Sequence, residues 1–125
     1  MRWLGKVPEN CILCTLDVSS LYTNIDADEG LTIVEEELEK AGQNQPSAKI
    51  LTCLLGKVLK LNNFTFNQEN FIQVKGTAMG TRAAPNFANV YMGRLEEKFV
   101  YQTDWFGSII DWVRFMDDIF LIWNG

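Results

Sequence analysis

The chain has 125 residues, and its 47% apolar and 22% charged residues are typical of one globular domain. Its net charge of -5 and pI near 4.6 are opposite to the basic surface of an autonomous nucleic-acid-binding protein. Histidine is absent, which excludes a Ser-His or Cys-His nucleophile. Cys11 and Cys14 have CxxC spacing, but Cys53 is the only further cysteine, so the chain lacks the four Cys or His ligands of a conventional zinc site. No apolar run approaches the roughly 20 residues of a membrane helix, and no N-terminal segment resembles a signal peptide.

The first predicted elements are a strand and a helix. Residues 11–18, CILCTLDV, form an apolar run that favours a strand buried on both faces and ending at Asp17. A polar connection, SSLYTNIDADEG, then leads into a helix expected over about residues 29–41. Acidic residues favour its N-terminus, and Gly42 favours its end. The spacing places one set of apolar residues on the inward face of this helix: Leu31, Val34, Leu38 and Ala41.

The middle of the chain predicts a second helix, a hairpin and a third helix. The second helix is expected to begin after Ser47 as N-cap and to run to about residue 61. Residues 64–76 are typical of a short hairpin with its turn near residues 67–70, and a glycine-rich stretch leads to a third helix that begins near Pro85. The second helix is expected to bury Ile50, Leu51, Leu54, Leu55, Val58 and Leu59, and the third Ala88, Tyr91, Met92, Leu95 and Phe99.

The last predicted element is a hairpin in residues 108–125, two apolar strands joined by a tight turn at Asp117-Asp118. The full order is then β-α-α-β-β-α-β-β. This order predicts an α+β fold in which a small antiparallel sheet is backed by helices. The three cysteines are expected to be reduced and mostly buried, as in an intracellular protein.

The adjacent pair Asp117-Asp118 has two interpretations. Paired aspartates in a turn are usually solvated turn formers. Here apolar residues flank the pair on both sides, which places it at the tip of a buried hairpin. Carboxylates at the edge of an apolar sheet repel one another and lose hydration, so they need a cation or another partner.

Asp17 supports the second interpretation, although it could also be a helix or turn cap. If its strand lies beside the final hairpin, three carboxylates converge on one point. Such a group suits two divalent ions about 3.5–4 Å apart, which activate an attacking 3′-hydroxyl and stabilise a leaving pyrophosphate. Mg²⁺ is the expected ion, with Mn²⁺ as a substitute, because it binds carboxylates and substrate phosphates.

Three segments resemble the motifs of reverse transcriptases, in the order that the family requires. LDVSSLYTNI resembles motif A, GTAMGTRAAPNFANVYM resembles motif B, and FMDDIF resembles motif C. The sequences of these motifs are most similar to those of the Penelope-like retroelements, which are related to telomerase reverse transcriptases. The resemblance covers residues 11–125 and implies a polymerase palm core whose function is RNA-directed DNA synthesis in a retrotransposon.

The resemblance also implies roles for individual residues. Asp17 and Asp117 would be the principal metal ligands, Asp118 the third acid, and the backbone carbonyl of Val18 a further ligand. Tyr22 would lie under the incoming sugar and exclude a 2′-hydroxyl, so that dNTPs are selected. The remaining positions would contact the nucleotide (Met79, Gly80) or the template and primer (Arg82, Ala84, Pro85). Many relatives have glutamine where this chain has Met79, and Arg82 is equally compatible with a solvated surface position.

The resemblance further implies that residues 1–125 form a partial reverse transcriptase domain. Motifs A, B and C are present, whereas most of the fingers and all of the thumb are expected to be absent, in agreement with the acidic charge. The expected partners are an RNA template, a DNA primer, dNTPs and those missing regions, without a membrane. The expected location is intracellular, and the nucleus follows from retroelement chemistry although no basic targeting cluster is visible.

Two other functions remain compatible with these motifs. The first is a degenerate or domesticated retroelement remnant that survives as a folded interaction module and polymerises poorly or not at all. The second is another two-metal palm enzyme, such as an RNA-templated RNA polymerase. Tyr22 favours a DNA polymerase over an RNA polymerase, because a bulky side chain under the sugar would reject ribonucleotides.

Overall fold

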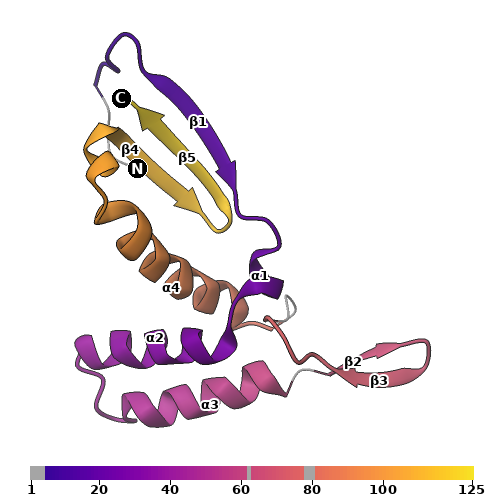
Figure 1. The fold of residues 1–125 in the computed structure, drawn as a ribbon. Helices are drawn as coiled ribbons and strands as arrows, with labels where there is room; N and C mark the ends of the chain where they lie inside the picture. Colours follow the sequence, from indigo (N-terminus) through magenta and orange to yellow (C-terminus); the bar gives the residue numbers. More distant parts are fainter. Residues whose placement is uncertain (1–4, 62, 78–80) are drawn as a thin grey trace. The chain divides into compact units, whose positions relative to one another are not determined.

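The computed structural model describes residues 5–61, 63–77 and 81–125 (Figure 1). The chain divides into two compact units. The sheet unit comprises residues 1–19 and 95–125, and the helical unit comprises residues 20–94. The elements are α-helices and small antiparallel sheets, which confirms the α+β class.

The sheet unit contains a three-stranded antiparallel sheet in the order β1-β5-β4. Its strands are β1 (Ile12–Asp17), β4 (Ile109–Phe115) and β5 (Asp118–Trp123). The central strand β5 supplies most of the buried side chains: Ile119, Leu121 and Ile122. A π-helical segment, Glu97–Tyr101, and a 3-10 helix, Asp104–Ser108, precede β4 and were not predicted.

The prediction that the first strand is buried on both faces is wrong. Strand β1 lies at an edge of the sheet, and Leu13 and Leu16 are about two-thirds and one-half exposed, with relative exposures of 65% and 49%. An apolar run indicates burial only when layers cover both faces of the sheet. Such layers are not found over β1 among the described residues, so the run gives an exposed apolar edge strand.

The described residues of the helical unit form three long helices, one short helix and a separate hairpin. The long helices and the hairpin are α2 (Ala27–Lys40), α3 (Ala48–Lys60), α4 (Ala84–Glu96, its last two residues in the sheet unit) and the two-stranded sheet β2-β3. A short helix, α1 (Leu21–Asn24), was not predicted. The strands of the separate hairpin are β2 (Asn63–Phe66) and β3 (Glu69–Ile72).

Both predicted helix starts near residues 29 and 47 have a side-chain cap. The Asp26 carboxylate accepts a hydrogen bond from the Glu29 N–H at 2.9 Å, and the Ser47 hydroxyl accepts one from the Ile50 N–H at 3.4 Å. Gly42, just past the end of α2, has a φ of +75°, as a helix stop requires. The caps therefore confirm the predicted boundaries within two residues.

Small residues let the helices approach one another closely. A Cβ added at Gly56 of α3 would lie 3.2 Å from Leu31 Cδ1 on α2, and one added at Gly30 of α2 would lie 2.3 Å from Phe87 Cζ on α4. Arg94 of α4 also reaches α2, where it donates to Glu36 at 2.6 Å and to Glu37 at 2.8 Å. The hydrogen bond from Arg94 to Glu37, and after it the one from Lys40, lower the pKa of the Glu37 carboxyl.

Several predicted buried residues are in fact exposed. On α3, Ile50, Leu54 and Val58 are each more than half exposed, whereas Thr52, Gly56 and Leu59 are buried. The helix is apolar over so much of its circumference that periodicity alone did not identify the side that packs. Three further predictions of burial are also wrong, for Ala41, Phe99 and Cys53; Cys11 and Cys14 are half-buried, and all three cysteines are free.

Candidate metal centre

Strand pairing in the sheet unit brings Asp17 beside the final hairpin. Strand β1 ends at Asp17 and β5 begins at Asp118, and these two residues are Cα partners in the antiparallel register. Met116 and Asp117 form the two-residue loop between β4 and β5, so the turn lies one residue earlier than predicted. The Val18 N–H donates to the Asp117 carbonyl at 2.9 Å, which extends the pairing into the loop.

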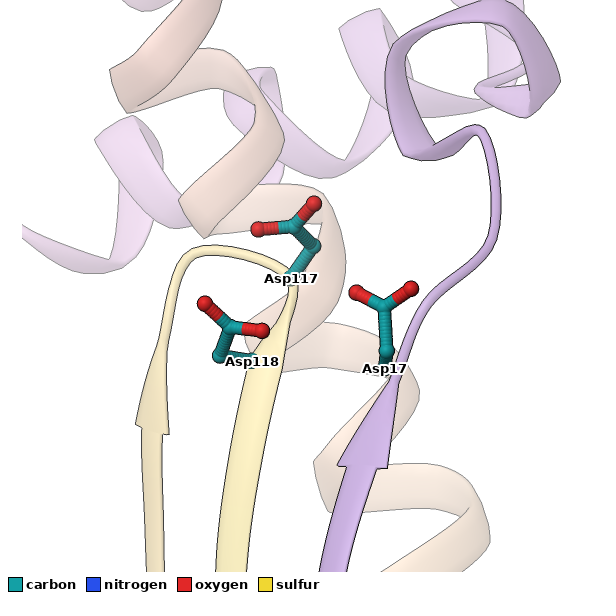
Figure 2. A group of neighbouring side chains, drawn as sticks. All are labelled: Asp17, Asp117 and Asp118. Carbon is teal, nitrogen blue, oxygen red and sulfur yellow. The ribbon is translucent and has the colours of Figure 1, made fainter.

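The three carboxylates gather at one edge of the sheet (Figure 2). Each of Asp17, Asp117 and Asp118 offers one carboxylate oxygen, and these oxygens all lie within 4.8 Å of one another. Asp17 and Asp118 are exposed, and Asp117 is partly buried. Within the part of the chain that the structure describes, no lysine or arginine pairs with any of these three carboxylates.

This donor set fits a hard divalent cation. Three anionic oxygens at this separation repel one another, and a divalent cation between them would convert the repulsion into attraction. Carboxylate oxygen is the ligand type that Mg²⁺ and Mn²⁺ prefer, whereas no histidine is available for a softer ion. Solvent exposure of two acids also leaves room for the water ligands that Mg²⁺ retains.

A shallow depression adjoins the carboxylates on the sheet. It has a volume of about 300 Å³, and Asp118 is one of its lining residues. Its other lining residues are mainly apolar: Thr15, Leu16, Val113, Phe115, Ile119 and Phe120. Phe115, the last residue of β4, is 79% exposed. The acidic group therefore lies next to an apolar surface rather than a basic one.

The sequence analysis did not identify Arg114 and Glu96, whose side chains support the Met116-Asp117 loop. Arg114 of β4 donates to the carbonyl of Met116 at 3.0 Å and to the Glu96 carboxylate at 2.8 Å. A charged residue between Val113 and Phe115 in an apolar strand was a signal that could have identified Arg114. Glu96 carries no comparable signal, because glutamate is common near the end of a helix.

The other predicted site residues that the structure describes belong to the helical unit. Tyr22 lies in α1 and is half-buried, and its backbone carbonyl accepts the Thr77 N–H at 2.5 Å. Ala84 is fully buried at the start of α4, whereas Pro85 and Arg82 are exposed. Met79 and Gly80, the predicted nucleotide contacts in motif B, lie outside the described residues.

Gly76 is a close-approach glycine that the sequence analysis missed. Its φ is +77°, and an added Cβ would lie 2.6 Å from Tyr22 O and 2.6 Å from Thr23 Cα. Only glycine fits this position without moving the backbone. The start of the motif B segment is therefore packed directly against the backbone of α1, at the residue predicted to select the sugar.

Comparisons with known proteins leave the family open. No protein-family model matches the chain, and no curated protein has a significant match to it. Among the described residues, none of the helices combines the length and apolar character needed to cross a membrane.

Proposed function

We propose that this chain is the palm segment of an RNA-directed DNA polymerase that transfers dNTPs onto a primer 3′-hydroxyl with two bound Mg²⁺ ions. The observation that carries the proposal is the convergence of Asp17, Asp117 and Asp118, with one oxygen of each within 4.8 Å of the others. The sequence resemblance to motifs A, B and C supports it independently, because it was drawn from residue types and their order.

In this proposal Asp17 at the end of β1 and Asp117 in the β4-β5 loop hold the metals, and Asp118 adds negative charge beside them. Bound Mg²⁺ would lower the pKa of the primer hydroxyl and neutralise charge on the leaving pyrophosphate. The Val18 N–H is engaged by Asp117 O, which keeps the backbone after Asp17 in a fixed orientation toward the loop. The Val18 carbonyl is the proposed backbone ligand.

Tyr22 is the proposed selector of the sugar. Its backbone carbonyl is held by the Thr77 N–H, and Gly76 packs against the same carbonyl. These contacts join the motif A segment to the start of motif B. They hold the backbone of Tyr22 in place, and so the point from which its aromatic ring projects. Template and primer contacts are assigned to Arg82, Ala84 and Pro85, and nucleotide contacts to Met79 and Gly80.

Calorimetric titration with Mn²⁺ tests the metal centre. The wild-type chain should bind Mn²⁺, and Asp17→Asn and Asp117→Asn should each abolish the binding because each removes one of three charges. Asp104→Asn is the matched control, since it removes an exposed aspartate of the same unit outside the group. Circular dichroism of each variant verifies that it is folded.

The outcomes separate the proposal from its alternative. Binding that is lost in both site variants and kept in the control supports one shared metal centre. A folded wild-type chain that binds no Mn²⁺, even with dNTP present, would favour the inactive retroelement remnant, since the acids would then be relics of a polymerase.

Primer extension tests the substrate class. A chimaera that carries the fingers and thumb of a related reverse transcriptase should incorporate dNTPs on an RNA template and reject rNTPs. Tyr22→Ala should admit rNTPs, whereas the ring-preserving Tyr22→Phe should not. Efficient rNTP incorporation by the unaltered chimaera would instead indicate an RNA polymerase.

A further inference from the structure

The loop that carries Asp117 contains a strained residue. Met116 has a φ of +58°, in the left-handed region that residues other than glycine, asparagine and aspartate rarely occupy. Its neighbour Asp117 supplies one of the three converging carboxylates. A backbone in this region persists only where surrounding groups hold it, and such positions are concentrated at functional sites.

The group that holds this loop is the side chain of Arg114. Its Nη1 donates to the Met116 carbonyl at 3.0 Å, and its Nε donates to Glu96 Oε1 at 2.8 Å. A guanidinium is planar and presents its N–H groups in a fixed fork, so fixing one nitrogen also fixes the direction of the other. The position of Glu96 therefore determines where the Met116 carbonyl is held.

Glu96 is itself held by a second donor. Trp112 Nε1 donates to the same Oε1 at 2.9 Å, and Trp112 and Arg114, two residues apart, project from the same face of β4. The side chains of Glu96 and Arg114 are 9% and 12% exposed. A buried ion pair adds little net stability compared with an apolar pair, and its best-attested use is to select one arrangement among several.

We propose that Arg114 is a positioning residue, which, anchored by Glu96, locks the Met116-Asp117 loop and so keeps the Asp117 carboxylate converged with Asp17. The expected effect of Arg114 on metal affinity rests on the proposed function. Its expected effect on the conformation of the Met116-Asp117 loop does not. All the groups involved lie in the sheet unit. The link to Asp17 is the hydrogen bond from the Val18 N–H to Asp117 O at 2.9 Å, and its strength reports directly on the loop.

Two substitutions separate positioning from general stabilisation. Arg114→Lys keeps a positive charge beside Glu96, but a single ammonium lacks the rigid fork that serves Glu96 and the Met116 carbonyl together. Trp112→Phe is the matched control, because it removes the other donor to Glu96 Oε1 and leaves the donor to Met116 in place. Both variants are made in the full chain, and the thermal unfolding midpoint is measured for each.

The first readout is amide hydrogen exchange at Val18, expressed relative to the amides of Leu121 and Ile122 in the same sheet. Arg114→Lys should accelerate Val18 exchange about tenfold relative to those amides, a change of about 1.4 kcal/mol in local opening. Trp112→Phe should change all three amides together. Equal Val18 ratios in the two variants would overturn the proposal, because Arg114 would then act only on overall stability.

The second readout is Mn²⁺ affinity. Arg114→Lys should weaken binding about tenfold, and Trp112→Phe should leave the affinity within twofold of the wild type even if it unfolds at a lower temperature. Affinity losses that follow the unfolding midpoints of both variants would overturn the positioning role. If the wild type binds no Mn²⁺, the proposed function fails while the Val18 ratio alone decides the role of Arg114.

Discussion

The described residues form two β-hairpins, both rich in aromatic residues and both closed by a two-residue loop. The loop of β2-β3 is Asn67-Gln68, with φ values of +51° and +65°. The loop of β4-β5 is Met116-Asp117, in which Met116 has a φ of +58°. Asparagine tolerates this region because its short polar side chain bonds locally, whereas methionine gains no such compensation.

The two hairpins also differ in what surrounds them. Every residue of β2 and β3 is exposed, and the stacked rings of Phe64 and Phe71, 5.6 Å apart, are their main internal contact. Strand β5 has partners on both sides and buries Ile119, Leu121 and Ile122. An isolated two-stranded hairpin is marginally stable in water. The comparison indicates that turn residues determine where along the chain a hairpin forms. Pairing with a further strand and burial of side chains then make the β4-β5 hairpin rigid enough to hold the three carboxylates.

The largest expected difference between the hairpins comes from the core. Ile122→Ala should lower the free energy of unfolding by about 3–4 kcal/mol, because a 3% exposed isoleucine leaves a cavity. Phe66→Ala on β2 should change it by less than about 0.5 kcal/mol, since Phe66 is 70% exposed. Chemical denaturation followed by circular dichroism measures both changes.

Tryptophan fluorescence supplies an independent probe of the first variant. Within the described part of the chain, the tryptophans Trp105, Trp112 and Trp123 all lie in the sheet unit. A loss above about 2 kcal/mol on Phe66→Ala would contradict the comparison, because it would mean that β2-β3 has a stabilising partner.

A smaller effect is expected from the two loops. Met116→Gly should leave stability unchanged or raise it by up to about 1 kcal/mol, because glycine removes the left-handed strain but has a more flexible unfolded state. Asn67→Ala should destabilise β2-β3 by about 0.5–1 kcal/mol, because alanine disfavours a positive φ. Denaturation measures the first change, and amide exchange of Phe66 and Glu69 measures the second. Destabilisation by Met116→Gly would show that the methionine side chain itself supports the loop.

The smallest expected effect is a pH dependence of the free energy of unfolding that comes from Tyr101, a residue close to Glu96 and Arg114. Burial, and then the charge of Glu96, raise the pKa of Tyr101 above its ordinary value of 10.0, while Arg114 opposes the rise. The folded state therefore keeps the phenol proton to higher pH than the unfolded state does. Stability should be unaffected below pH 10 and fall as the pH rises through 10 toward the raised pKa.

Tyr101→Phe should reduce this alkaline loss, measured by tryptophan fluorescence in denaturant at several pH values. Tyr91→Phe is the control in the helical unit, where burial and Glu29 also raise the tyrosine pKa. An unchanged alkaline loss in Tyr101→Phe would contradict the prediction. An equal effect of both substitutions would show that the two units unfold together.

Local chemistry in the sequence determined the elements and the acids of the site. Ser47 caps its helix as predicted, and Asp26 is one of the acidic residues predicted at the start of the first helix. The final hairpin forms within its predicted range, the other begins one residue before its range, and Asp17 ends its strand. These features depend on residues within a few positions of one another, where backbone preferences and short hydrogen bonds act. Convergence of Asp17 with Asp117 and Asp118 was expected if the first strand lay beside the final hairpin, because Asp17 ends that strand and the two other aspartates lie at the hairpin turn.

Only the tertiary structure decided which surfaces are covered and what holds the acidic loop. Periodicity marks an apolar face but does not say whether anything packs on it, so β1 and the outer face of α3 were wrongly expected to be buried. The hydrogen bond from Arg114 to Glu96 joins residues 18 positions apart, and the β1-β5 register joins Asp17 to Asp118 across most of the chain. Such pairings depend on the folded positions of whole strands and helices, which no local preference encodes.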